Sequence, residues 1–149
     1  MRLSPNFTLA EFTRSDTASK AGVDNSPDEE HLRNLQRLAA TLERVRTLLG
    51  DRPLLISSGY RSPALNALVG GSRTSDHSNG LAADFTCPKF GDVAEVCRAI
   101  VASDIPFDQI IFEQGAAPWV HLGVGTRNRR EVLSWSKRSG YVSGLKKLG

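Results

Sequence analysis

Two histidines and one aspartate are the residues of this sequence whose types and spacing best suit catalysis. His77 and Asp84 lie seven positions apart in the stretch SDHSNGLAAD, and His121 lies in the stretch WVHLGV. In the first stretch a polar turn is followed by an apolar run that ends on a carboxylate. Such a carboxylate either caps a neighbouring element or binds a metal ion together with the histidine. Two imidazoles and a carboxylate are a common ligand set for catalytic zinc, which keeps a fourth position for water.

His121 taken alone would more often be a core histidine with satisfied ring nitrogens. Strict alternation in a strand places Trp119, His121 and Gly123 on one face. If the strand that ends on Asp84 is a neighbour of that strand, and the turn carrying His77 lies next to it, the three side chains converge. His77, Asp84 and His121 are therefore candidate ligands for one zinc ion.

The elements that must position these residues can be read from apolar spacing. The segment Asn25-Ser26-Pro27, followed by acidic residues, is typical of a helix start, and apolar residues at spacings of three and four predict an amphipathic helix as far as Gly50. Further helices are predicted at 63–68 and 92–103, and strands at 53–58, 80–86, 109–113, 119–124 and 131–135. Residues 1–27 are expected to be irregular and the basic tail 141–149 loosely held. Helices set apart from clustered strands favour an α+β fold.

Length and composition indicate one domain over residues 1–149. Hydrophobic content of 40% and charged content of 23% are ordinary for a soluble globular protein. No stretch approaches the roughly 20 apolar residues of a membrane span, so we expect no membrane insertion. The opening MRLSPNFTLAEFTRSD has no apolar signal-peptide core, so we expect synthesis in the cytoplasm without a signal peptide.

The net charge of +3 is a mild bias toward anionic partners, such as nucleic acid, a membrane surface or an acidic cell-wall polymer. We expect no nucleic-acid partner, because the basic run TRNRR is not interleaved with the aromatic residues that stacking platforms need. Cys87 and Cys97 form neither a CxxC pair nor a zinc-ribbon spacing. They are expected to be reduced, buried thiols, although a disulfide between them is geometrically possible.

A family resemblance rests on the same residues. Ser75, His77, Gly80, Ala82 and Asp84 match the SxHxxGxAxD signature of the zinc D-alanyl-D-alanine carboxypeptidase family, which also includes phage L-alanyl-D-glutamate endopeptidases. WVH matches that family's second motif, and the runs SSGYRSPALNALVGGSRTSDH, FDQIIFE and FTLAEFTRSDTASKAGVDNSP also resemble family members. The resemblance spans nearly the whole chain. It implies the small α+β hedgehog/D,D-peptidase fold, with the zinc ion lying on an antiparallel sheet and held by the two histidines and the aspartate.

The resemblance also suggests roles for residues around the metal. Arg61, in GYRS, matches an arginine that contacts substrate carboxylate or oxyanion charge, for which a guanidinium offers a planar fork of donors. A surface arginine paired with an acidic group is the alternative. Ser75 is expected to donate a hydrogen bond near the ligands rather than to act as a nucleophile, because nothing here reads as a serine triad. Trp119, in the second motif, is expected beside the ligands or the substrate.

The general base is not where several family members have it. They place the catalytic carboxylate three residues before the last histidine ligand, and that position here is Pro118. Glu113 is the next candidate, provided that 109–113 and 119–124 pair as a hairpin, and Asp108 follows it. In the alternative, Glu113 is a structural surface charge and the protein binds zinc without turnover.

These observations predict a zinc metallopeptidase that hydrolyses the peptide stems of bacterial peptidoglycan, acting as a phage endolysin with endopeptidase activity. A D,D-carboxypeptidase that removes a terminal D-alanine stays open, as does a non-catalytic zinc-containing wall-binding or virion domain, which Pro118 favours. We expect a monomer made in the cytoplasm, that of the host if the gene is a phage's, which acts in the periplasm on the cell wall.

Overall fold

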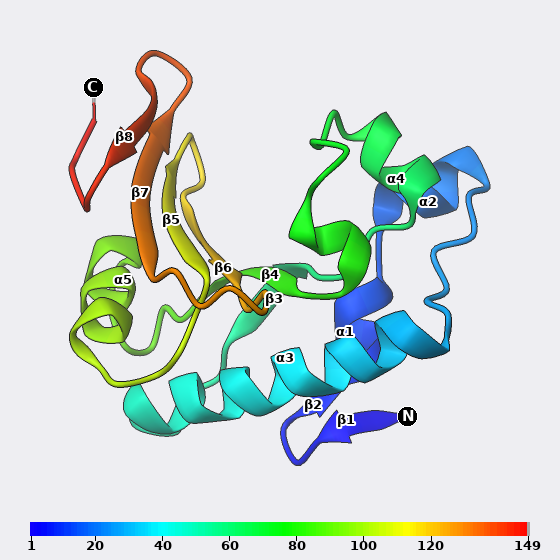
Figure 1. Cartoon of the computed structure of the whole chain (residues 1–149), viewed down its shortest axis with the longest axis horizontal. Helices are drawn as coiled ribbons and strands as arrows, with labels where there is room; N and C mark the ends of the chain where they lie inside the picture. The colour runs from blue at the N-terminus through cyan, green and yellow to red at the C-terminus, as the bar shows by residue number, and fades with distance from the viewer. Residues whose placement is uncertain (149) are drawn as a thin grey trace.

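The computed structural model describes residues 1–148 and confirms the α+β fold (Figure 1). Across its six-stranded sheet the order is β3 (Leu55–Ser58), β4 (Ala82–Thr86), β6 (Trp119–Gly123), β5 (Gln109–Gln114), β7 (Glu131–Ser136) and β8 (Gly140–Ser143). Neighbouring strands are antiparallel, except that β5 and β7 run parallel. The predicted strands therefore all exist, although β3 and β4 each begin two residues later than predicted.

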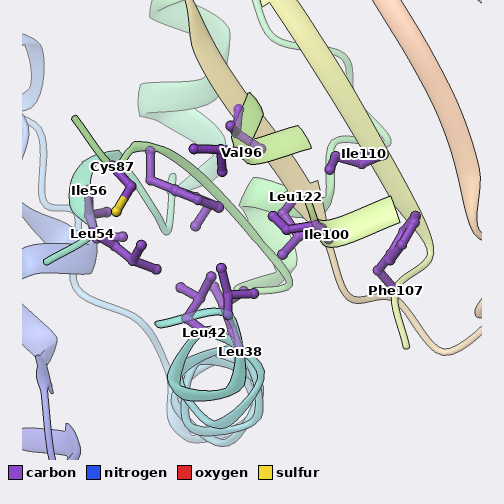
Figure 2. Packing of buried hydrophobic residues seen from close by; sticks show 14 of the residues in the cluster. Leu38, Leu42, Leu54, Ile56, Cys87, Val96, Ile100, Phe107, Ile110 and Leu122 are labelled. Atoms are coloured by element: carbon purple, nitrogen blue, oxygen red, sulfur yellow. The ribbon is translucent and has the colours of Figure 1, made fainter. Parts of the chain in front are cut away.

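Two amphipathic helices, α3 (Glu29–Leu48) and α5 (Val93–Ala102), pack on one face of this sheet. Asp28 caps the start of α3 by accepting a hydrogen bond from the backbone N–H of His31 at 2.8 Å. Figure 2 shows the packing, with Leu38 and Leu42 of α3 below the strands and Val96 and Ile100 of α5 beside them. The opposite face of the sheet is left for the site.

The two cysteines lie within this core as free thiols, which confirms the expectation of reduced, buried residues. Cys97 is fully buried on α5, and burial raises the pKa of its thiol to about 12. No helix within residues 1–148 has the length and apolar character to cross a membrane.

The prediction that residues 1–27 are irregular is wrong. They form a two-stranded sheet, β1 (Arg2–Ser4) with β2 (Phe7–Thr8), and two short helices, α1 (Leu9–Thr13) and α2 (Asp16–Ala21). Thr8 and Glu11 form a reciprocal capping box at the start of α1, and Ser15 caps α2. These elements are too short for periodicity to reveal them, but the T-x-x-E cap signal was readable in the sequence.

Over residues 141–148 the expectation of a loosely held tail is also wrong, because β8 pairs with β7 and residues 144–148 are bonded to the sheet, while Gly149 lies outside the described residues. The Ser134 hydroxyl donates to the Gly144 carbonyl at 2.7 Å and accepts from the Lys146 backbone N–H at 2.8 Å. The Gln114 side chain bonds the backbone of Lys146 and Leu148. These hydrogen bonds and the packing of Leu145 on the core hold the segment, and a single apolar residue gives no pattern that predicts it.

Two short helices lie between β3 and β4 and complete the surroundings of the site. They are α4 (Pro63–Leu68), as predicted, and a 3₁₀ helix over Asp76–Asn79. The 3₁₀ helix ends at Gly80, whose φ of 73° is a left-handed conformation that favours glycine. In Figure 1 the strands β7 and β8 form one end of the molecule, α2 and α4 form the other, and β4 and β6 lie between them.

Candidate metal centre

His77, Asp84 and His121 converge on the face of the sheet that α3 and α5 leave open. Asp84 on β4 lies directly opposite His121 on β6, and His77 comes from the 3₁₀ helix that precedes β4. The Asp84 Oδ1 atom lies 3.2 Å from His77 Nε2 and 3.0 Å from His121 Nδ1. The three ligand atoms all lie within 4.8 Å of one another, a spacing that fits one zinc ion with an open fourth position.

The orientation of His77 also fits a metal ligand. The side chain is almost fully buried, and its Nδ1 atom lies 2.7 Å from the backbone carbonyl oxygen of Gly59. Because a carbonyl only accepts, Nδ1 carries a proton, which leaves Nε2 as the ring nitrogen that can bind a metal. A backbone acceptor behind a histidine ligand is the usual way in which proteins fix its tautomer and ring orientation.

Gly59 can serve in this way because the N-terminal segment packs directly behind it. The Tyr60 backbone N–H donates to the Phe12 carbonyl at 2.7 Å. A Cβ atom at Gly59 would lie 2.6 Å from that carbonyl oxygen and 2.7 Å from the Phe12 Cα atom, so only glycine fits. Helix α1 therefore supports the metal centre, a role that the sequence did not reveal.

The electrostatics of Asp84 suit a bound cation. Burial acts to raise the pKa of Asp84, but the charge of His77, one hydrogen bond from each histidine and the charge of His121 outweigh it. The net effect holds the pKa of Asp84 well below its usual range. The Asp84 carboxylate, mostly buried between two imidazoles, therefore has the deprotonated form that a metal ligand requires.

The structure places Ser75 and Arg61 beside the ligands. The Ser75 hydroxyl accepts from the His77 backbone N–H at 3.2 Å and so caps the turn that carries a ligand, whereas we expected it to donate a hydrogen bond. Arg61 Nη2 lies 3.4 Å from this hydroxyl, and the buried Nε has no partner within residues 1–148. Burial lowers the pKa of Arg61, and the nearby charge of Asp84 opposes this shift. Arg61 thus faces the centre with donors that a substrate can use.

The predicted hairpin of β5 and β6 is confirmed, and it brings Glu113 to the site. Ile111 lies opposite His121, and Glu113 lies opposite Trp119. Because side chains alternate along a strand, Glu113 shares the open face and is a diagonal neighbour of His121. Diagonal neighbours lie about 7–8 Å apart, within reach of a long side chain. Pro118 is exposed in the turn before β6.

The environment of Glu113 raises the pKa of its carboxyl. Partial burial raises the pKa of Glu113, the charge of His121 lowers it, and the charge of Asp84 raises it, with a net upward shift. A carboxyl whose pKa is raised toward the working pH is a better general base than an ordinary surface glutamate.

Asp108, the other candidate base, is committed elsewhere. Its buried carboxylate accepts from Arg129 Nε at 2.9 Å and Nη2 at 3.0 Å, and from the Arg129 backbone N–H at 3.1 Å. Arg127 Nη2 lies 3.5 Å away. The hydrogen bonds from Arg129 are the main cause of a lowered pKa of Asp108. The structure thus places Asp108 as an anchor for the loop after β6.

Two neighbouring cavities lie at the site. One, of about 470 Å³, is lined by all three ligands together with Glu113 and Trp119. The other, of about 360 Å³, shares Arg61 and Asp84 with it and continues past Tyr60 to Arg14 and Ser15. Both volumes are in the range of ligand pockets. Sequence reasoning missed Arg14, Arg127 and Tyr141 as lining residues, because their segments carry no motif for a ligand.

The fold and the site together define an α+β domain with a candidate zinc centre on its sheet. The sequence model of the peptidase M15 family matches residues 5–122, and the chain belongs to this family. It is also similar to a zinc D-Ala-D-Ala carboxypeptidase of Streptomyces albus G, with 33% identity over 79 residues. That match covers 53% of this chain and 30% of the Streptomyces enzyme, so the chain spans well under half of that relative. The family resemblance inferred from the signature residues is confirmed.

Proposed function

We propose that this chain is a zinc-dependent endopeptidase that cleaves the peptide stems of bacterial peptidoglycan. The observation that carries the proposal is the metal centre at the junction of two cavities, both lined by Arg61 and Asp84. Substrate can extend from the ligands in both directions, as an internal bond of a peptide requires.

The mechanism assigns each step to a side chain of this centre. His77, Asp84 and His121 would hold the zinc ion, which supplies Lewis acidity and lowers the pKa of a water molecule. Glu113 accepts the proton of the attacking water and passes it to the leaving amine.

Arg61 provides a positive charge that stabilises negative charge on the substrate in this mechanism. Its guanidinium donates to the oxyanion of the tetrahedral intermediate or to a substrate carboxylate. Its location at the boundary of both cavities suits either use, because both lie next to the scissile bond.

A D,D-carboxypeptidase is the second candidate, and the name of the Streptomyces relative favours it. Such an enzyme must recognise a free chain end beside the metal, for which Arg61 is a suitable carboxylate partner. The continuation of the second cavity to Arg14 favours the endopeptidase, because a terminal D-alanine does not need this space.

We further propose that the protein is a phage endolysin. It would act as a monomeric single domain on the cell wall in the periplasm. The net charge of +3 suits an anionic wall polymer. The proposal is that the protein is released to the wall from the cytoplasm in which it is made.

The test is digestion of purified Gram-negative peptidoglycan, with and without a chelator, followed by mass spectrometry of the released fragments. We expect chelator-sensitive cleavage between L-alanine and D-glutamate. Loss of a single terminal alanine would establish the carboxypeptidase instead. Glu113→Gln should abolish release while zinc stays bound, and Glu30→Gln, an exposed change on α3, is the matched control. Absence of cleavage by folded, zinc-loaded protein would mean a non-catalytic domain.

A further inference from the structure

A row of aromatic side chains crosses the open face of the sheet next to the metal centre. Trp119 on β6 is paired with Glu113 on β5, Glu113 with Trp135 on β7, and Trp135 with Tyr141 on β8. Directly paired residues of neighbouring strands share a face, so these four side chains form one line across four strands. We call Trp119, Trp135 and Tyr141 the aromatic row.

The aromatic row lies one step along the sheet from the ligands. Asp84 and His121 are paired with each other, and Trp119 is two residues from His121 on the same strand and the same face. Trp119 and Tyr141 both line the cavity that contains the metal ligands. The row is therefore continuous with the site rather than a separate surface.

The row is accessible to a ligand. Tyr141 is 63% exposed, and Trp119 and Trp135 are partly exposed. On the other face of β7, Ser134 and Ser136 are buried, which shows that Trp135 points away from the core. Leaving large aromatic side chains exposed to water on an open sheet face is unfavourable. Tyr and Trp are enriched at interfaces, where the ring contacts an apolar partner and the polar tip contacts water.

The arginines of the cavity lie away from the aromatic row. Arg127 and Arg129 lie near the start of β5, where both contact the Asp108 carboxylate, and Arg61 lies beside Ser75. The aromatic row lies at the other end of β5, next to Glu113. Four residues of strand separate these ends, which is about 13 Å. An anionic part of a substrate would thus bind at the arginine end, and an uncharged part at the aromatic end.

We propose that the aromatic row is a binding platform for the glycan strand of peptidoglycan, on which an uncharged N-acetylated sugar ring stacks while its peptide stem occupies the metal centre. A sugar ring has a flat C–H face and a polar edge, and the exposed face of Tyr or Trp offers a rigid apolar partner with a polar tip. The row spans three strand-to-strand steps, about 14 Å, which provides room for more than one ring.

This inference rests on the proposed function and adds to it the direction in which the substrate lies across the site. The first stem residue is attached to the sugar, and the second is a glutamate with a free carboxylate. With the sugar on the aromatic row, the glutamate would extend toward Arg61 and Arg127, and the bond between the two residues would lie over the ligands. Trp135 and Tyr141 also lie beyond residues 5–122, so the match to the family does not include them.

A binding experiment tests the platform without catalysis. The only two tryptophans of the sequence, Trp119 and Trp135, both lie in the row, so intrinsic fluorescence reports on it directly. We would titrate the zinc-loaded protein with N,N′,N″-triacetylchitotriose. We expect a saturable fluorescence change, with a Kd that rises roughly tenfold in Tyr141→Ala and stays near the wild-type value in Tyr141→Phe, which keeps the ring. Leu55→Ala, an exposed apolar residue on the opposite edge strand β3, is the control and should leave binding unchanged.

A second experiment compares two substrates that share one peptide, a disaccharide-linked stem peptide and the same peptide without sugars. We expect the wild-type kcat/KM to favour the glycosylated substrate about tenfold or more, and Tyr141→Ala to bring this ratio toward one. Tyr141→Phe should keep the preference. A loss in Tyr141→Phe as large as in Tyr141→Ala would mean that the phenol hydroxyl, not the ring face, is used, and would overturn the platform.

The two proposals can fail separately. Absence of a saturable fluorescence change at millimolar oligosaccharide, or equal use of both substrates by the wild type, would overturn the platform while leaving the peptidase intact. Oligosaccharide binding without cleavage of either substrate would instead refute the proposed function.

Discussion

Replacing Gly59 by alanine should lower the zinc affinity of the centre, although Gly59 is not itself a ligand. The added Cβ atom would lie 2.6 Å from the Phe12 carbonyl oxygen and 2.7 Å from the Phe12 Cα atom, whereas ordinary contacts begin near 3.4 Å. Both obstacles are backbone atoms, so they cannot rotate away. The strand or α1 must shift, and with it the Gly59 carbonyl that holds His77 Nδ1 at 2.7 Å.

The expected magnitude has two parts. Overpacking of this kind costs about 1–3 kcal/mol of unfolding free energy, which lowers the Tm of a chain of this length by about 3–10 °C. Disturbing the partner that orients a histidine ligand lowers metal affinity by about 10–100-fold. Thermal unfolding of the metal-free protein measures the first effect, and zinc competition against a chromophoric chelator measures the second.

Gly115→Ala is the matched control, since a Cβ atom there would meet nothing within 4 Å. It should leave both Tm and zinc affinity near wild type. Wild-type zinc affinity in Gly59→Ala would refute the claim that the N-terminal segment positions His77 through this glycine.

Three further predictions concern single carboxylates and a ligand histidine. Glu113→Gln should lower kcat by about 10²–10⁴-fold while one zinc ion stays bound, and a comparable loss of zinc would mean a structural role instead. Asp84→Ala and His121→Ala should each abolish stoichiometric zinc binding, measured by metal analysis after dialysis, and wild-type zinc content in either variant would contradict the ligand assignment. Asp108→Asn should cost about 1–3 kcal/mol at pH 7, because it removes charged hydrogen bonds from Arg129. Since the folded-state pKa of Asp108 is lowered, its contribution is present above the unfolded value of about 3.9 and is lost as pH falls through the folded pKa. Urea unfolding of both proteins should therefore converge toward acidic pH, and a constant difference would show that the effect is not electrostatic.

The three candidate ligands could be predicted because each lies in a short stretch of sequence with a recognisable pattern. His77 and Asp84 lie within one ten-residue stretch, and His121 lies in a strand with clear alternation. The pairing of Asp84 with His121 needed only that β4 and β6 be neighbours. The position of Glu113 near His121 could be predicted from the β5–β6 hairpin, because it depends only on the register of the two strands.

The N-terminal support of the site could not be predicted in the same way. Its elements are two to six residues long, and their contacts with the site are backbone hydrogen bonds and close backbone approach rather than an apolar stripe. Asp108 could not be assigned either, because its partner Arg129 lies 21 residues away in a loop whose conformation the sequence does not encode locally. The parallel pairing of β5 with β7 brings Trp135 next to Glu113, and no hairpin signal predicts a pairing of that kind.

The most direct test of the central claim is a paired measurement on one sample, with zinc stoichiometry from native mass spectrometry and hydrolysis of a defined stem peptide. The account predicts one zinc ion per chain and cleavage of an internal stem bond that disappears when the metal is removed and returns when it is restored. One bound zinc ion without any cleavage, or cleavage that persists in the metal-free protein, would contradict it.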